Sequence, residues 1–123
     1  MHRVVHFEIC ADEPERAVQF YRNVFGWEIS TWDGPAEYSI VTTGDDGTPG
    51  INGGLVHRGG SVTGQGINLI DVPSLDAALM HIADNGGDMI HPRVSVPGVG
   101  HVAYCRDTEG NSFAIIEMDS SAA

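Results

Sequence analysis

Three side chains that could do chemistry alternate near the start of the chain, in the run Val4-Val5-His6-Phe7-Glu8-Ile9-Cys10. If this run is a β-strand, His6, Glu8 and Cys10 lie on one face and apolar side chains on the other, because successive side chains of a strand point to opposite faces. An imidazole, a carboxylate and a thiol on one face could bind a metal ion, bind a polar ligand or face solvent. A semi-enclosed pocket would raise the pKa of a carboxyl group, so Glu8 is also a candidate general base.

Charge balance and cysteine usage exclude several classes of function. The 123 residues, one domain's worth, hold 6 Lys and Arg against 17 Asp and Glu, a formal net charge of -11. Such a chain repels phosphate, so neither nucleic acid nor a membrane surface is an expected partner. Cys10 and Cys105 lie in apolar runs and are predicted to be buried free thiols. The chain begins with no leader-like segment and has no apolar run of about 20 residues, so we expect a cytoplasmic protein.

The rest of the pattern predicts one structural unit that occurs twice. Shifting the chain by 61 positions brings Ile9 onto Ile70, Ala17 onto Ala78 and Gly26 onto Gly87. These are core and stop positions of a strand–helix–strand unit. Helices are predicted from Pro14 to Gly26 and from Ser74 to Asn85, and strands over 4–10, 27–32, 38–43, 51–57, 66–72, 89–96, 101–106 and 112–118. We therefore predict two tandem βαβββ modules, about 2–57 and 65–119, joined by a flexible linker at about 58–64.

Two blocks of sequence resemble a known superfamily. The first is Glu15-Arg16-Ala17-Val18-Gln19-Phe20-Tyr21 with Val24-Phe25-Gly26-Trp27, and the second is Asp107-Thr108-Glu109-Gly110-Asn111 followed by Phe113-Ala114-Ile115-Ile116-Glu117. They resemble the vicinal-oxygen-chelate superfamily, which includes glyoxalase I, the bleomycin-resistance proteins and the extradiol dioxygenases. The resemblance implies an α+β fold in which two βαβββ modules form a half-cup mixed sheet with helices on the outer face. It also implies a homodimer.

The resemblance further implies where a metal site would lie. In metal-dependent members, one ligand comes from the first and last strand of each module, and His6 matches the first of these positions. The other three positions correspond to Ile67 (Asn68 if the register differs by one), Gly53 (or Gly54) and Ala114. One imidazole cannot supply the three or more protein ligands that such sites use. No metal cofactor is therefore expected.

Three functions of different classes remain open. The first is a metal-free cup that binds a small organic molecule, lined by His6, Glu8, Gly53, Tyr104 and Ala114. The second is a divalent-metal-dependent lyase, isomerase or dioxygenase with a rearranged site built from His6, Glu8 and His57. The third is an interaction domain whose cup is filled by its own side chains.

Further residues are candidates for the walls and mouth of the pocket. Trp27, Trp32, Tyr38 and Tyr104 are possible aromatic walls, and Tyr104, which lies close to the last turn, is the first choice. His101 follows a glycine-rich turn and could reach the pocket mouth. The run Gly50-Ile51-Asn52-Gly53-Gly54-Leu55 places a double glycine inside a strand, which predicts either a close approach of another backbone or added room in the cup.

Overall fold

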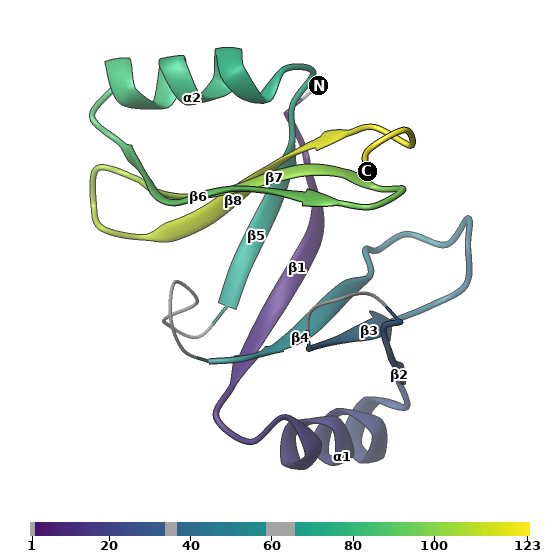
Figure 1. The fold of residues 1–123 in the computed structure, drawn as a ribbon. Helices are drawn as coiled ribbons and strands as arrows, with labels where there is room; N and C mark the ends of the chain where they lie inside the picture. Colours follow the sequence, from purple (N-terminus) through teal and green to yellow (C-terminus); the bar gives the residue numbers. More distant parts are fainter. Residues whose placement is uncertain (1, 34–36, 59–65) are drawn as a thin grey trace. The chain divides into compact units, whose positions relative to one another are not determined.

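The computed structural model describes residues 2–33, 37–58 and 66–123 and confirms the predicted α+β fold with two βαβββ modules (Figure 1). Most of the predicted linker, residues 59–64, lies outside the described residues. The elements are β1 (Val4–Ala11), α1 (Pro14–Phe25), β2 (Glu28–Thr31), β3 (Tyr38–Thr42), β4 (Gly53–His57), β5 (Gly66–Asp71), α2 (Leu75–Asp84), β6 (Asp88–Val96), β7 (Gly100–Arg106) and β8 (Ser112–Met118).

The chain divides into two compact units that do not coincide with the sequence modules. The N-terminal unit is His6–Ile67, and the C-terminal unit combines the start of the chain up to Val5 with Asn68–Ala123. The first residues are tied to the second unit because the main-chain N–H of Asp71 donates to the carbonyl oxygen of Arg3 at 3.0 Å. Strand β1 therefore contributes its first two residues to one unit and the remainder to the other.

The sheet of the N-terminal unit has the order β2-β3-β4-β1, with β1 parallel to β4 and the other pairs antiparallel. One face carries the hydrophobic core beneath α1, made of Ala11, Ile29, Val41 and Leu55 with Phe7, Ile9, Ala17, Val18, Tyr21 and Trp27 packed against it. The apolar side chains of β1 belong to this core, so the alternating His6, Glu8 and Cys10 lie on the opposite face, as predicted. We call the sheet face opposite the helix the inner face.

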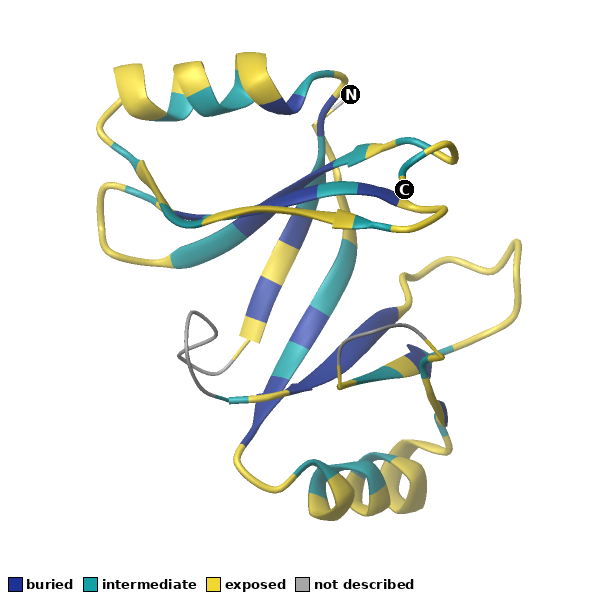
Figure 2. Cartoon of the chain, viewed as in Figure 1, coloured by how far each residue is buried: buried dark blue, intermediate teal, exposed yellow. Residues whose placement is uncertain are grey.

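Helix α1 begins and ends where the sequence predicts. Pro14 occupies the first turn, where its missing N–H costs no hydrogen bond, and Glu15 places a carboxylate at the positive end of the helix dipole. Gly26 ends the helix with a left-handed φ of 71°, and its N–H donates to the carbonyl oxygen of Arg22 at 2.9 Å. None of the 12 residues of α1 is buried, and Figure 2 shows the helix as exposed and half-buried along its length.

The C-terminal unit repeats the arrangement with the strand order β5-β8-β7-β6. Strands β5 and β8 are parallel, and the other pairs are antiparallel. The Ser74 hydroxyl caps α2 by accepting a hydrogen bond from the N–H of Ala77 at 3.2 Å. The core under α2 consists of Val72, Leu75, Ala103, Cys105 and Ile115.

Two predictions from the sequence concern the two cysteines and the membrane, and the described residues bear on both. Cys10 and Cys105 are both buried and free, as predicted. Burial raises the pKa of the Cys105 thiol to about 11, with the charge of Asp88 adding to the effect, so this thiol stays protonated at neutral pH. No helix in the described part of the chain is long and apolar enough to span a membrane.

The two cores predict a matched pair of destabilising substitutions. Leu55 and Leu75 are each 1% exposed, one in each core, so Leu55→Ala and Leu75→Ala should each lower the free energy of unfolding by about 2–5 kcal/mol. Urea denaturation measures the change, and Met80→Ala is the control because Met80 is 68% exposed. A loss no larger than that of the control at either leucine would contradict the assignment of that core.

Candidate functional site

The inner face of the N-terminal unit is organised around a hydrogen bond between His6 on β1 and Tyr38 on β3. Nε2 of His6 and the Tyr38 hydroxyl are 2.8 Å apart. The Tyr38 ring also makes an edge contact with Trp32, with ring centroids 6.0 Å apart. Burial lowers the pKa of His6 below its ordinary value, because a charged imidazolium loses hydration there. A neutral imidazole with one ring nitrogen engaged is therefore the resting form.

The double glycine makes room for aromatic side chains of the same unit. A Cβ atom added at Gly54 would lie 1.8 Å from the Tyr38 hydroxyl oxygen and 2.0 Å from Cζ, so the Tyr38 ring end lies directly over this glycine. A Cβ added at Gly53 would instead lie 2.5 Å from both the ring and the carbonyl oxygen of Phe7. Because Tyr38 already uses the space above Gly54, these contacts do not support the interpretation that the glycines open the cup.

The register of β1 against β4 shows which of the two glycines shares a face with His6 and Glu8. Gly54 is the register partner of Glu8 on β1, and Gly53 is the partner of Phe7, which packs under α1. Gly53 was the predicted ligand contact, with Gly54 as the one-residue alternative. The register corrects this prediction, because the inner-face position on β4 is Gly54.

Glu8 is the one charged residue in the buried core of the described chain, at 4% exposure. Its charge lies close to Cys10, where burial first and the negative charge of Glu8 second raise the pKa of the thiol, while Arg58 opposes the shift. Cys10 is therefore a protonated thiol and a poor nucleophile at neutral pH. The inner face of β1 thus presents a neutral imidazole, a buried carboxyl group and a thiol.

His57 lies on the wrong face to join His6 and Glu8. It follows Leu55 by two positions on β4, and Leu55 belongs to the core under α1. His57 lines a polar groove of about 630 Å³ between α1 and β2–β4. The predicted grouping of His6, Glu8 and His57 is therefore wrong, because residues two apart on a strand share a face, and His57 lies with Leu55 on the face under α1.

His101 belongs to a separate hydrogen-bonded cluster in the C-terminal unit. Its Nδ1 is 3.1 Å from the Ser95 hydroxyl, and its Nε2 is 3.3 Å from Oδ2 of Asp119. Hydrogen bonds from Ser121, and then from His101, lower the pKa of the Asp119 carboxyl group. His101 shares the face of Ala103, which packs under α2, so it is not on the inner face of its unit.

The inner face of the C-terminal unit is apolar at the positions where the superfamily would place ligands. Ala114 on β8 is fully buried, and it pairs in register with Leu69 on β5 and with Tyr104 on β7. Tyr104 and Ala114, both predicted site residues, are therefore direct neighbours on one face. Ile67, which precedes Leu69 by two positions on β5 and is the last residue of the N-terminal unit, is 3% exposed, so the equivalent of His6 is a buried aliphatic residue.

Similarity to known proteins places the chain in one superfamily. The family model for the bleomycin resistance protein-like N-terminal region matches residues 3–44. A glyoxylase-like domain-containing protein of Didymella fabae is 32% identical over 117 residues, which is 88% of each chain. The chain belongs to the glyoxalase and bleomycin-resistance superfamily. This glyoxalase-like chain matches the family model over residues 3–44 and the Didymella fabae relative over 88% of its length.

Solved structures share the fold of this superfamily member at low sequence identity. A hypothetical protein of Bacillus halodurans C-125 superposes with a TM-score of 0.71 at 16% identity, covering 99% of this chain and 98% of that one. Methylmalonyl-CoA epimerase in complex with methylmalonyl-CoA and NH4+ gives a TM-score of 0.70 at 17% identity, covering 100% and 99%. At these identities the likeness establishes the fold alone.

The metal site implied by the glyoxalase superfamily does not fit the residues of this chain. His6 is the single donor among the matched positions, since Gly54, Ile67 and Ala114 have no metal-binding side chain. Across residues 2–33, 37–58 and 66–123, no three His, Cys, Asp or Glu side chains are grouped so that they could hold a metal ion. Metal chemistry of the superfamily type would therefore need donors that these positions do not supply.

Tyr38 is the residue whose importance the sequence showed least. It is one of four candidate aromatic walls in the sequence, among which Tyr104 is the first choice. The signal that could have identified it is the double glycine, because a glycine inside a strand often marks the close approach of another group. Which side chain fills that space depends on the register of β3 against β4, and the sequence of either strand alone does not determine this.

The two glycines predict different responses to the same substitution. In Gly54→Ala, the new methyl group meets the movable end of Tyr38, so the fold should persist while the His6–Tyr38 hydrogen bond is lost. In Gly53→Ala, it meets the carbonyl oxygen of Phe7, so β1 must shift and unfolding free energy should fall further. Unfolding curves and NMR spectra of the His6 ring measure both effects. An unchanged His6 spectrum in Gly54→Ala would contradict the placement of Tyr38.

His6 predicts a pH dependence of stability with a definite sign. Its pKa is lower in the folded chain than the ordinary value of 6.5, so the unfolded chain binds more protons just below pH 6.5. The contribution of His6 to stability is therefore fully present above pH 6.5 and is lost as the pH falls toward its folded pKa. Unfolding free energies of wild type and His6→Gln, measured from pH 8 to pH 5, should diverge least at the acidic end. A constant difference across this range would exclude the shift.

Proposed function

We propose that this protein binds a small organic molecule on the inner face of the N-terminal unit, without a metal ion. The observation that supports this most is the hydrogen bond between His6 and Tyr38. His6 is the matched position that retains a metal-binding side chain, and its Nε2 is engaged by a phenol of the same chain. The side chains that remain on this face are suited to hydrogen bonding and apolar contact.

The chemistry of the inner face indicates the kind of ligand. A neutral imidazole, a phenol and the buried Glu8 can hydrogen-bond to a hydroxyl or an amine, and a cationic amine would also pair with a carboxylate. Trp32 and the 38%-exposed Ile40 offer apolar contact on the same face. The formal charge of -11 favours the approach of a cation. We therefore propose an aromatic or aliphatic amine or alcohol as the ligand class, bound by a cytoplasmic protein.

Of the other two functions, the geometry argues against the metal-dependent enzyme and gives some support to the interaction domain. The rearranged site of a metal-dependent enzyme could not include His57, because His57 lies on the helix-covered face. The interaction domain with a filled cup gains some support, because Tyr38 fills the space above Gly54 with a side chain of the same unit. Glu8 remains a candidate general base, and Tyr104 and Ala114 remain predicted ligand contacts.

A ligand screen with matched variants tests the proposal. Thermal unfolding should shift upward with at least one member of a panel of cationic glycopeptides, aromatic amines, phenols and quinones. His6→Gln and Tyr38→Phe should each weaken binding by about three- to tenfold, the usual effect of losing one hydrogen bond. His57→Gln is the control, because His57 lies on the other face and should leave affinity unchanged.

Two outcomes would contradict this proposal. If no ligand in the panel shifts the unfolding temperature, the filled-cup interpretation is favoured instead. If protein purified without chelator contains one equivalent of metal, and His6→Gln abolishes metal binding, the metal-free interpretation is wrong.

A further inference from the structure

Ser95, His101 and Asp119 form a chain of hydrogen bonds in the C-terminal unit, which shares no residue with the ligand site proposed for the N-terminal unit. The Ser95 hydroxyl oxygen is 3.1 Å from Nδ1 of His101, and Nε2 of the same ring is 3.3 Å from Oδ2 of Asp119. A hydroxyl, an imidazole and a carboxylate linked in this order activate the serine nucleophile in hydrolases of several unrelated folds. The arrangement therefore points to nucleophilic chemistry at Ser95.

Strand pairing positions the three side chains. Ser95 on β6 and His101 on β7 are register partners, and His101 is also the partner of Glu117 on β8. Side chains directly opposite each other on neighbouring strands have Cβ atoms about 4.5–5.5 Å apart, so the hydroxyl and the imidazole meet on one face of the sheet. Asp119 follows directly after β8, and its N–H donates to the carbonyl oxygen of Val99 in the β6–β7 turn at 2.8 Å. Main-chain hydrogen bonds thus hold all three members of the cluster.

The carboxylate of Asp119 determines which ring nitrogen of His101 carries a proton. The hydroxyl of Ser121 donates to Oδ1 of Asp119 at 2.5 Å and the N–H of Ser121 at 2.9 Å, and these two bonds, followed by that from His101, lower the pKa of the Asp119 carboxyl group. An ionised carboxylate only accepts hydrogen bonds, so Nε2 of His101 carries the proton and Nδ1 presents its lone pair. The Ser95 hydroxyl must then donate to Nδ1. This is the protonation pattern of a general base facing its nucleophile.

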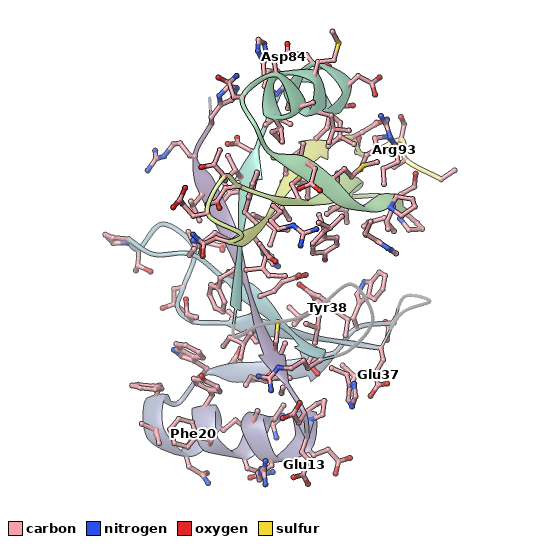
Figure 3. All side chains as sticks on the ribbon, turned by 90° about the vertical axis from the view of Figure 1, so that its left-hand side faces the viewer. Glu13, Phe20, Glu37, Tyr38, Asp84 and Arg93 are labelled. Carbon is pink, nitrogen blue, oxygen red and sulfur yellow. The ribbon has the colours of Figure 1, made fainter. Side chains whose placement is uncertain are left out.

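The charged neighbours of the cluster already have partners. Glu117, the carboxylate opposite the imidazole on β8, accepts a hydrogen bond at its Oε1 from the main-chain N–H of Leu75 at 2.8 Å. Arg93, two residues before the serine on β6, forms an ion pair with Asp76 on α2, and Figure 3 shows Arg93 beside that helix. The carboxylate that contacts the imidazole is therefore the one that follows β8.

Exposure and charge indicate the kind of substrate. Ser95 is exposed on β6, the edge strand of the sheet, whereas the side chains of His101 and Asp119 are only 26% and 36% exposed. Val99, in the adjoining turn, is 38% exposed and offers apolar contact to a small group at the serine. The formal charge of -11 disfavours the approach of an anion. An uncharged ester of a short carboxylic acid fits these conditions.

We infer that Ser95 is a nucleophile that accepts an acyl group from such esters, with His101 as its general base and Asp119 as the positioning residue. The Ser95 oxygen forms a bond to the ester carbonyl carbon while its proton passes to Nδ1 of His101. The bond from that carbon to the leaving alkoxide then breaks, and the alkoxide takes the proton from Nδ1 and departs as an alcohol. Water attacks the acyl carbon in the same way, which releases the carboxylic acid and restores the serine hydroxyl.

Reaction of the full chain with 4-nitrophenyl acetate tests this inference. Nitrophenolate is a better leaving group than the serine alkoxide, so wild type should release one equivalent in a burst and carry an acetyl group on Ser95. His101→Gln should lower the burst rate about a hundredfold, the usual contribution of a general base, and Ser95→Ala should abolish the burst. Ser120→Ala and His81→Gln are the matched controls, because both remove an exposed side chain of the same type, and they should react as wild type does.

A spectroscopic measurement separates the role of Asp119 from a purely structural one. In Asp119→Asn, NMR of the His101 ring nitrogens should show that the form protonated at Nε2 is no longer the single tautomer, and the burst rate should fall while the chain stays folded. Peptide mass spectrometry on acetylated wild type keeps the test decisive if a variant fails to fold. The absence of a burst in wild type would overturn the inference. An acetyl group found only on other residues, or a burst that Ser95→Ala leaves intact, would overturn it too.

Discussion

The inner face of the N-terminal unit depends on one contact, in which the Tyr38 side chain crosses above Gly54 and its hydroxyl hydrogen-bonds to Nε2 of His6. This contact needs a glycine at position 54, because any Cβ there would collide with the phenol. It also requires β3 to pair with β4 in the observed register. His6 stands at a position that metal-dependent relatives use for coordination, and here its Nε2 is engaged in a hydrogen bond within the chain.

The residues at the other matched positions agree with this use of His6. Ile67 and Ala114 are buried aliphatic positions, and Gly54 carries no side chain, so the positions related to His6 by the repeat contribute packing or space. A lone imidazole in a half-buried setting is stable as the neutral form, and burial lowers its pKa accordingly. Superfamily membership defines where a site would lie in this chain, and the side chains now at those positions define a different chemistry.

The sequence predicted the fold, and it predicted which side chains of β1 share a face, for identifiable physical reasons. Alternation along β1 has a period of two, so it placed His6 and Glu8 on one face without further information. On β4 the alternation gives no signal, because Gly53 and Gly54 have no side chain and both Leu55 and Val56 are buried. His57 was therefore assigned to the wrong face. The role of Tyr38 depends on a pairing between strands distant in sequence, which local pattern does not specify.

We infer that His6 serves a hydrogen-bonded pair with Tyr38 and not a metal ion. NMR of the His6 ring nitrogens during titration with Zn²⁺, Ni²⁺ or Co²⁺ tests this claim most directly. One equivalent of each metal should leave the His6 resonances unchanged, while Tyr38→Phe alone should shift them. Stoichiometric broadening or displacement of the His6 resonances by a metal, absent in His6→Gln, would show instead that His6 is a metal ligand.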